Sequence, residues 1–233
     1  MKGRRKPGPA ERVRRLHDQL AEAYGPQHWW PAETPFEVVL GAYLTQNTSW
    51  KAVERSLANL RAAGAFTVEG LRAMPLAELR RAIQPSGFFT RKAPALKAFV
   101  AMLDAEFDGS LDRLAAAPTA ALRPRLLALA GVGQETADAI LLYALGHAVP
   151  VADEYLRRIA ERHGLVALQA GKRGYEGLTA LTREAFAGDP VTGQARLFNE
   201  FHALTVAVGK AHCGRVARCE GCPLAGDLRY ARS

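Results

Sequence analysis

The chain has 233 residues, 48% of them hydrophobic, which is enough to bury a core and argues against an intrinsically disordered protein. Its 31 Lys and Arg exceed its 23 Asp and Glu, and the resulting net charge of +8 suits a polyanionic partner. No apolar run approaches the ~20 residues that span a bilayer, and the N-terminus lacks an apolar signal core. We therefore expect a cytoplasmic protein without a membrane partner.

Apolar spacing predicts two consecutive helices in the first quarter of the chain. Residues 36–44 place their apolar side chains on one helical face, and residues 50–60 repeat this pattern. The polar turn 45–47 separates the two stretches, and Asn47 or Thr48 is the predicted N-cap of the second helix. The two helices are therefore expected to lie close together.

The rest of the chain continues the helical pattern with glycine and proline punctuation. Gly87 is predicted to cap a helix C-terminus, and a further amphipathic helix is predicted from Thr90 onward. No convincing alternation of apolar and polar residues indicates a strand. We therefore expect an all-α fold.

The most informative segment is a predicted helical hairpin over residues 122–144. A leucine-rich helix runs into the turn Gly131-Val132-Gly133, and a second helix follows from Thr136. Two glycines permit a sharp turn and leave backbone N–H groups uncovered beside the positive end of the second helix. This arrangement suits a bound phosphate, although an ordinary structural turn has the same spacing.

A carboxylate follows the hairpin at Asp153, at the predicted start of another helix. Taken alone, an aspartate in this position is a helix N-cap. Residues 129–138 (LAGVGQETAD) followed by Asp153 resemble the helix-hairpin-helix and catalytic aspartate signature of the endonuclease III superfamily of DNA glycosylases. Residues 40–48 (LGAYLTQNT) also resemble the first barrel helices and DNA-probing turn of that superfamily.

The resemblance implies an overall architecture of two helical lobes with the active-site cleft between them. Residues 37–147 would form a six-helix barrel lobe that contains the helix-hairpin-helix motif. Residues 1–36 and 148–233 would form a terminal lobe with a C-terminal cysteine loop. The implied partner is double-stranded DNA carrying a damaged base, bound by a monomer that associates with the nucleoid.

The resemblance also implies roles for individual residues. Gly131 and Gly133 would approach a DNA phosphate, and Gln46 would fill the gap left by an extruded base, where its amide can donate and accept hydrogen bonds. Asp153 would be catalytic, because a carboxylate stabilises the positive charge that develops on the sugar as the base leaves. Basic residues predicted to contact DNA are Arg91, Lys92, Arg157 and Lys210.

One departure from endonuclease III concerns the reaction itself. Where bifunctional relatives carry a lysine in the hairpin motif, this chain has Glu135. Without that amine no nucleophile is evident for a Schiff base with the sugar, so we expect a monofunctional glycosylase with weak or absent lyase activity. The main alternative is an endonuclease III-like glycosylase and lyase for oxidised pyrimidines. A second alternative is a non-catalytic helix-hairpin-helix DNA-binding protein.

Glu135 and the aromatic residues point to one branch of the superfamily. They most resemble the 3-methyladenine DNA glycosylase III branch, in which residues matching Trp29 and Trp50 flank the damaged base and Pro31 adjoins the pocket. An alkylated purine is cationic, and it gains ~0.5–2 kcal/mol from an aromatic face. Glu135 would add to this preference. Trp50 also lies on the apolar stripe of its helix, where a core role is the alternative.

Three cysteines gather near the C-terminus, at Cys213, Cys219 and Cys222. Their odd number argues against a disulfide framework, and their spacing resembles a [4Fe-4S] motif with one ligand missing. Asp227 is the favoured fourth ligand, and His212 is another donor. Zinc, or no metal at all, is the alternative. Whichever holds, the expected role is structural, bringing the basic C-terminal loop to DNA.

Overall fold

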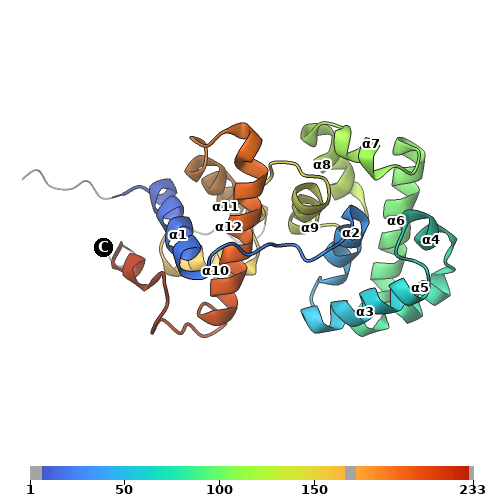
Figure 1. The fold of residues 1–233 in the computed structure, drawn as a ribbon, viewed down its shortest axis with the longest axis horizontal. Helices are drawn as coiled ribbons and strands as arrows, with labels where there is room; N and C mark the ends of the chain where they lie inside the picture. Colours follow the sequence, from blue (N-terminus) through green and yellow to red (C-terminus); the bar gives the residue numbers. More distant parts are fainter. Residues whose placement is uncertain (1–6, 166–171, 231–233) are drawn as a thin grey trace, which may run out of the picture. The chain divides into compact units, whose positions relative to one another are not determined.

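The computed structural model describes residues 7–165 and 172–230, and it is helical over these ranges (Figure 1). Within them, extended pairing is limited to an isolated bridge between Cys213 and Ala217. This confirms the expected all-α fold. Among the described residues, no helix is long and apolar enough to cross a membrane. The chain divides into two compact units, residues 30–147 and residues 1–29 with 148–233.

The unit of residues 30–147, called here the barrel unit, begins at Trp30, whereas the expected lobe begins at Glu37. Its helices are α2 (Pro35–Leu44), α3 (Trp50–Ala62), α4 (Val68–Ala73), α5 (Leu76–Ala82), η1 (Gln84–Ser86), α6 (Phe89–Phe107), α7 (Leu111–Ala116), α8 (Thr119–Ala128), α9 (Gln134–Ala139) and the π-helical turn η2 (Ile140–Ala144).

Helix α2 is the central element of the barrel unit. It packs against α3, α6, α9 and η2, and nine of its ten residues are buried. The predicted single apolar face is therefore wrong for this helix, because neighbours cover it on several sides. The side chain of Thr34 caps its N-terminus by accepting a hydrogen bond from the Glu37 backbone N–H at 3.2 Å.

The turn after α2 differs from its prediction in one respect. The N-cap of α3 is Ser49, not Asn47 or Thr48, and Ser49 makes no side-chain capping bond. Asn47 instead adopts a left-handed backbone with φ of 52°. Asparagine tolerates this conformation better than most residues, so Asn47 shapes the turn and the helix begins after it.

The segment before α6 follows its prediction closely. Gly87 has φ of 67° and ends the short 3-10 turn η1, with its N–H donating to the Gln84 carbonyl at 3.1 Å. Helix α6 then begins at Phe89, one residue before the predicted Thr90. Phe88, between the two, also has a left-handed backbone, with φ of 47°.

The second unit, called here the terminal unit, consists of α1 (Pro9–Tyr24), α10 (Glu154–Arg162), α11 (Lys172–Ala185), α12 (Val191–Ala211) and η3 (Ala225–Tyr230). Within it, α1 packs against α11 and α12, and α10 packs against α12 (Figure 1). Helices from both ends of the sequence thus share one core.

The contact of α10 with α12 depends on a glycine. A Cβ atom built on Gly209 would come within 2.2 Å of the ring of Tyr155, so only glycine lets the two backbones approach this closely. Gly193, near the start of the same helix, has open space around its Cα.

Replacing Gly209 with Ala should therefore destabilise the chain by about 1–3 kcal/mol, because the added methyl group overpacks the contact with Tyr155. The matched control is Gly193→Ala, which should be neutral or stabilising by about 0.5–1 kcal/mol in an open helical position. Urea unfolding of both variants measures the difference. Equal stability of the two would show that the close packing is not needed.

Candidate functional site

Asp153 is the N-cap of α10, as its position after the hairpin predicts. Its Oδ1 accepts a hydrogen bond from the Leu156 backbone N–H at 2.8 Å, and only 11% of its side chain is exposed. The second oxygen, Oδ2, lies 3.7 Å from Nε2 of His202 on α12. The capping bond fixes the orientation of the carboxylate.

The hairpin turn lies in the barrel unit between α8 and α9. Gly131 has φ of 81°, a conformation that favours glycine, whereas Gly133 has φ of −91° and is the N-cap of α9. The backbone conformation therefore requires glycine at position 131 but not at position 133. A Cβ atom at Gly133 would meet nothing within 4 Å, so this position stays open to an approaching partner. Glu135 is exposed in the first turn of α9.

Gln46 lies next to this hairpin, although 85 residues separate it from Gly131. Its Nε2 donates to the Gly131 carbonyl at 3.0 Å and to Oγ1 of Thr136 at 2.9 Å. The two segments singled out in the sequence, the 45–47 turn and the hairpin, are thus joined directly. The amide is oriented by the same turn that is expected to bind phosphate.

A small cavity of about 190 Å³ opens beside Gln46. Its lining residues come from α2, the following turn, α6 and the hairpin: Tyr43, Gln46, Asn47, Phe88, Arg91, Lys92, Ala95 and Gly131. Phe88 is 56% exposed, unusual for a phenylalanine, and Arg91 is exposed as well. Sequence reasoning missed Phe88, because an exposed phenylalanine before a helix has no signature that separates it from a core residue.

Lys92 does not have the role expected from the sequence. It is only 4% exposed, and its Nζ donates to the carbonyls of Leu44 at 2.8 Å and Ser86 at 2.9 Å. Burial lowers the pKa of its ammonium group. Lys92 therefore ties the end of α2 to η1, and an ammonium held in this way does not reach a phosphate from the surface.

The other basic residues predicted to contact DNA differ in their exposure and in their ion pairs. Arg91 is exposed at the cavity. Arg157 pairs within its own helix with Glu154 at 2.6 Å and Glu161 at 3.1 Å, so a phosphate would have to compete with two carboxylates. Lys210 is exposed near the end of α12.

The two residues of the predicted aromatic pair belong to different units, Trp29 to the terminal unit and Trp50 to the barrel unit. Within the barrel unit, Trp50 meets Trp30 edge-on, with ring centroids 5.6 Å apart. Trp30 also packs on Tyr143 at 5.4 Å. Trp30 and Trp50 are half-buried. Part of the Trp50 ring thus packs in the core, as the alternative for this residue expected, and part remains accessible.

Trp29 lies under a cation in the terminal unit. Nζ of Lys210 lies 5.6 Å from the centroid of the Trp29 ring, within the range of a cation–π contact. The ring is half-buried. Any base that stacks on Trp29 would therefore meet a positive charge nearby.

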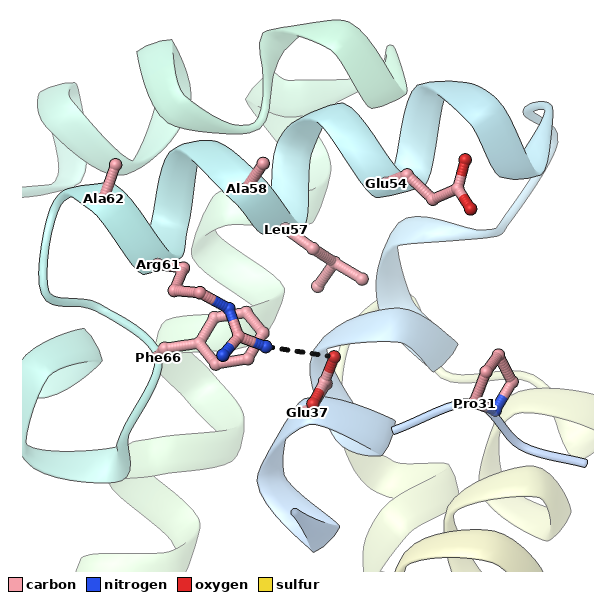
Figure 2. Close-up of a pocket in the computed structure, with 8 residues that line it drawn as sticks. All are labelled: Pro31, Glu37, Glu54, Leu57, Ala58, Arg61, Ala62 and Phe66. Carbon is pink, nitrogen blue, oxygen red and sulfur yellow. Dashed lines mark ion pairs between the residues drawn. The ribbon is translucent and has the colours of Figure 1, made fainter. Parts of the chain in front are cut away.

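Pro31 lines a groove within the barrel unit. It is exposed at the rim of a groove of about 480 Å³ along α3, whose other walls include Glu37, Arg61 and Phe66 (Figure 2). The guanidinium of Arg61 points across the groove to Glu37, 3.6 Å away, and lies over the Phe66 ring at 4.2 Å (Figure 2). The charged groups and the ring that line this groove are thus already in contact with one another.

The proposed fourth metal ligand, Asp227, is engaged elsewhere. Its side chain is 6% exposed; it accepts hydrogen bonds from Nη2 of Arg12 at 2.5 Å and Nε at 3.0 Å, and its Oδ2 lies 2.8 Å from Nδ1 of His163. Burial alone would raise the pKa of Asp227, but the bonds with His163 and Arg12 hold it below its usual range. Both carboxylate oxygens thus already have partners, which argues against the predicted role of Asp227 as a ligand.

The three thiols lie in one loop without forming a metal centre with other donors. Sγ of Cys213 accepts a hydrogen bond from Nη1 of Arg162 at 3.0 Å, while burial and the neighbouring thiols raise the pKa of Cys222. His212 places its Nδ1 3.0 Å from the Arg218 carbonyl. Among the described residues, no three His, Cys, Asp or Glu side chains are arranged to hold a metal ion. The residues thus do not fit a [4Fe-4S] cluster or zinc as arranged.

Comparison with known proteins agrees with this fold and these motifs. A Methanocaldococcus jannaschii protein named as a DNA repair glycosylase is 36% identical over 216 residues, covering 92% of this chain and 94% of that protein. The crystal structure of H. pylori 3-methyladenine DNA glycosylase bound to 1,N6-ethenoadenine superposes with a TM-score of 0.72 at 27% identity, covering 88% of this chain and 98% of that one.

A covalent complex of endonuclease III with DNA has the same fold, with a TM-score of 0.75 at 21% identity over 96% of this chain and 97% of that one. The model of the HhH-GPD superfamily of base excision DNA repair proteins matches residues 40–180, which include the 45–47 turn, the hairpin and Asp153. From this match and the M. jannaschii relative, the chain belongs to the HhH-GPD superfamily of base excision DNA repair proteins.

Proposed function

We propose that the chain is a monofunctional DNA glycosylase that removes an alkylated purine, such as 3-methyladenine, from duplex DNA. The observation that carries the proposal is the carboxylate of Asp153, nearly buried and oriented by the first turn of α10. In the family signature this is the catalytic position. The named relatives, a DNA repair glycosylase and a 3-methyladenine DNA glycosylase, support the same reaction class.

The chemistry follows from the charge of Asp153. As the bond between the base nitrogen and C1′ breaks, the electron pair leaves with the base and positive charge develops on the sugar. An oriented anion stabilises that charge without reorganising during the reaction. Water then adds to C1′, and the carboxylate can accept the proton that the water loses.

The barrel unit would supply residues that bind DNA. Gly131 and Gly133 leave the hairpin backbone open to a phosphate, and Gln46 beside them is suited to the gap left by an extruded base. Phe88 and Arg91, on the cavity next to Gln46, add an exposed aromatic ring and a cation. An apolar ring at such a position can wedge between stacked bases.

The aromatic residues and Glu135 support an alkylated purine as the substrate. Trp29, Trp30 and Trp50 are all half-buried and can offer ring surface to a flat base. A cationic base gains most from such faces, whereas Lys210 near Trp29 opposes it by repulsion. Glu135 stands where a Schiff-base lysine would stand, which favours water as the nucleophile.

The test uses labelled duplexes that carry 3-methyladenine, thymine glycol or an abasic site, with products separated before and after alkali. Release of 3-methyladenine with strand breaks only after alkali is the expected result. Strand cleavage at thymine glycol or abasic sites without alkali would establish the alternative glycosylase and lyase. Binding of all duplexes without any base release would establish the non-catalytic alternative.

Borohydride should trap no covalent adduct between the wild-type protein and DNA, since no amine occupies the position of Glu135. The one lysine at the cavity, Lys92, already donates to two carbonyls. If an adduct does form, Lys92→Met shows whether that amine is responsible. An adduct lost in Lys92→Met would refute the monofunctional proposal and identify the nucleophile.

Phe88→Ala should slow excision from duplex DNA by about tenfold or more, because each stacked aromatic is worth ~1–3 kcal/mol. Excision from the same lesion in single-stranded DNA should change little, since no stack has to be opened. The control is Phe66→Ala, another aromatic of the barrel unit, which lies in the groove along α3. Equal losses on duplex and single-stranded DNA would contradict a wedge role for Phe88.

A further inference from the structure

A second titratable side chain faces the catalytic carboxylate. Nε2 of His202 lies 3.7 Å from Oδ2 of Asp153, and the two side chains are only 9% and 11% exposed. Both belong to the terminal unit, with His202 on α12 and Asp153 at the start of α10. Neither the sequence motifs nor the family signature singled out this histidine.

The placement of His202 is built into the helix packing. Gly209 lets α12 approach α10 closely enough for Tyr155, two residues after Asp153, to lie against it. Seven residues earlier on α12, His202 is thereby held opposite the carboxylate. Its backbone carbonyl accepts a bond from Oγ1 of Thr205 at 2.8 Å. A carboxylate within 4 Å is a hydrogen-bonding partner that a buried histidine can use.

The two oxygens of Asp153 therefore have different surroundings. Oδ1 accepts the Leu156 N–H and keeps its place in the cap. Oδ2 faces His202 at a distance longer than a hydrogen bond. Catalytic hydrogen bonds are often long in a free enzyme and tighten when substrate binds.

We propose that His202 is a positioning residue for Asp153, donating from Nε2 to Oδ2 and holding the carboxylate toward the reacting sugar. The inference rests on the proposed function, in which Asp153 stabilises the developing positive charge. Loss of the contact leaves only Oδ1 anchored and lets the plane of the carboxylate turn.

The expected effect is kinetic. His202→Leu removes the donor and should lower the single-turnover rate of base excision by about 10- to 100-fold, the effect of a small misplacement of a catalytic group. His202→Gln places an amide N–H near the position of Nε2 and should restore the rate to within a few-fold of wild type. Affinity for a duplex with a stable abasic-site analogue should stay unchanged in both variants.

The matched control is His17→Leu. His17 is a buried histidine of the same unit, on α1, where it contacts Phe186 and pairs with Asp18 rather than with Asp153. This variant should excise at the wild-type rate, whatever it does to stability. Melting temperatures of all variants show whether a slow rate reflects unfolded protein.

Nuclear magnetic resonance of the imidazole nitrogens tests the contact without any substrate. The resonance of Nε2 of His202 should shift when Asp153 is replaced by Asn, and the resonances of His17 should not. This readout separates the two failures: a wild-type protein that excises no lesion refutes the proposed function, while a His202 signal insensitive to Asp153 refutes the positioning role. Equal slowing by His202→Leu and His202→Gln would also overturn it.

Discussion

Asp153→Asn should lower the rate of base excision by about three orders of magnitude, the upper range for removal of one oriented stabilising group. The amide is neutral, so it no longer stabilises the positive sugar or accepts a proton from water. Its oxygen can still accept the Leu156 N–H, because asparagine is as good an N-cap as aspartate. The fold and DNA affinity should therefore be preserved.

The measurement is single-turnover excision of 3-methyladenine beside binding to an abasic-analogue duplex. Glu154→Gln is the matched control, since it removes a negative charge from the next residue, where the carboxylate is 55% exposed and pairs with Arg157. The control should keep the wild-type rate. If Asp153→Asn were as active as Glu154→Gln, the assignment of the catalytic carboxylate would be wrong.

Asp227→Ala should lower the free energy of unfolding by about 3–5 kcal/mol, because it leaves buried Arg12 and His163 without their shared carboxylate. This contact joins α1, α10 and η3 and closes the two ends of the sequence onto each other. The matched control is Asp104→Ala, which breaks an exposed two-bond pair with Arg72 and should cost about 0–1 kcal/mol.

The same pair gives a pH dependence. The pKa of Asp227 is lower in the folded chain than its ordinary value of about 3.9, so its stabilising contribution is present above that value. The contribution is lost as the pH falls through the folded pKa. The stability difference between wild type and Asp227→Ala should thus be large at neutral pH and shrink in acid.

Urea unfolding at several pH values measures this difference, and iron and zinc are assayed in both proteins. We expect the metal content, whatever it is, to be the same, because Asp227 serves an ion pair and not a ligand set. If the wild type and Asp104→Ala both bind metal and Asp227→Ala does not, the carboxylate of Asp227 is a ligand.

Local signals in the sequence were sufficient for the helical fold class and the hairpin motif, although not for the N-cap of α3. The helical period over residues 36–44, the glycines of the hairpin and the aspartate at a helix start each depend on neighbours within a few residues. Gly131 does adopt a left-handed backbone, and Asp153 does cap α10. Short-range geometry decides such features, so the sequence carries them without knowledge of the tertiary fold.

The assignment of charged and aromatic side chains depended on contacts between distant segments. Lys92 was predicted to contact DNA and is buried against Leu44, and Asp227, next to the position expected for a fourth ligand, pairs with Arg12, 215 residues away. Exposure and pairing are set by which elements pack together, and helical period alone does not encode this. The contacts of Trp30 with Trp50 and of His202 with Asp153 are of the same kind.

The sequence by itself thus determined the fold class, the family and the position of Asp153 at the start of the helix after the hairpin, since these follow from local patterns in a fixed order. Tertiary structure alone decided which polar groups are free to meet DNA, which hold the core, and that a histidine faces Asp153. The physical reason is that burial and ion pairing depend on contacts between residues far apart in the chain. No regular spacing in the sequence predicts such contacts.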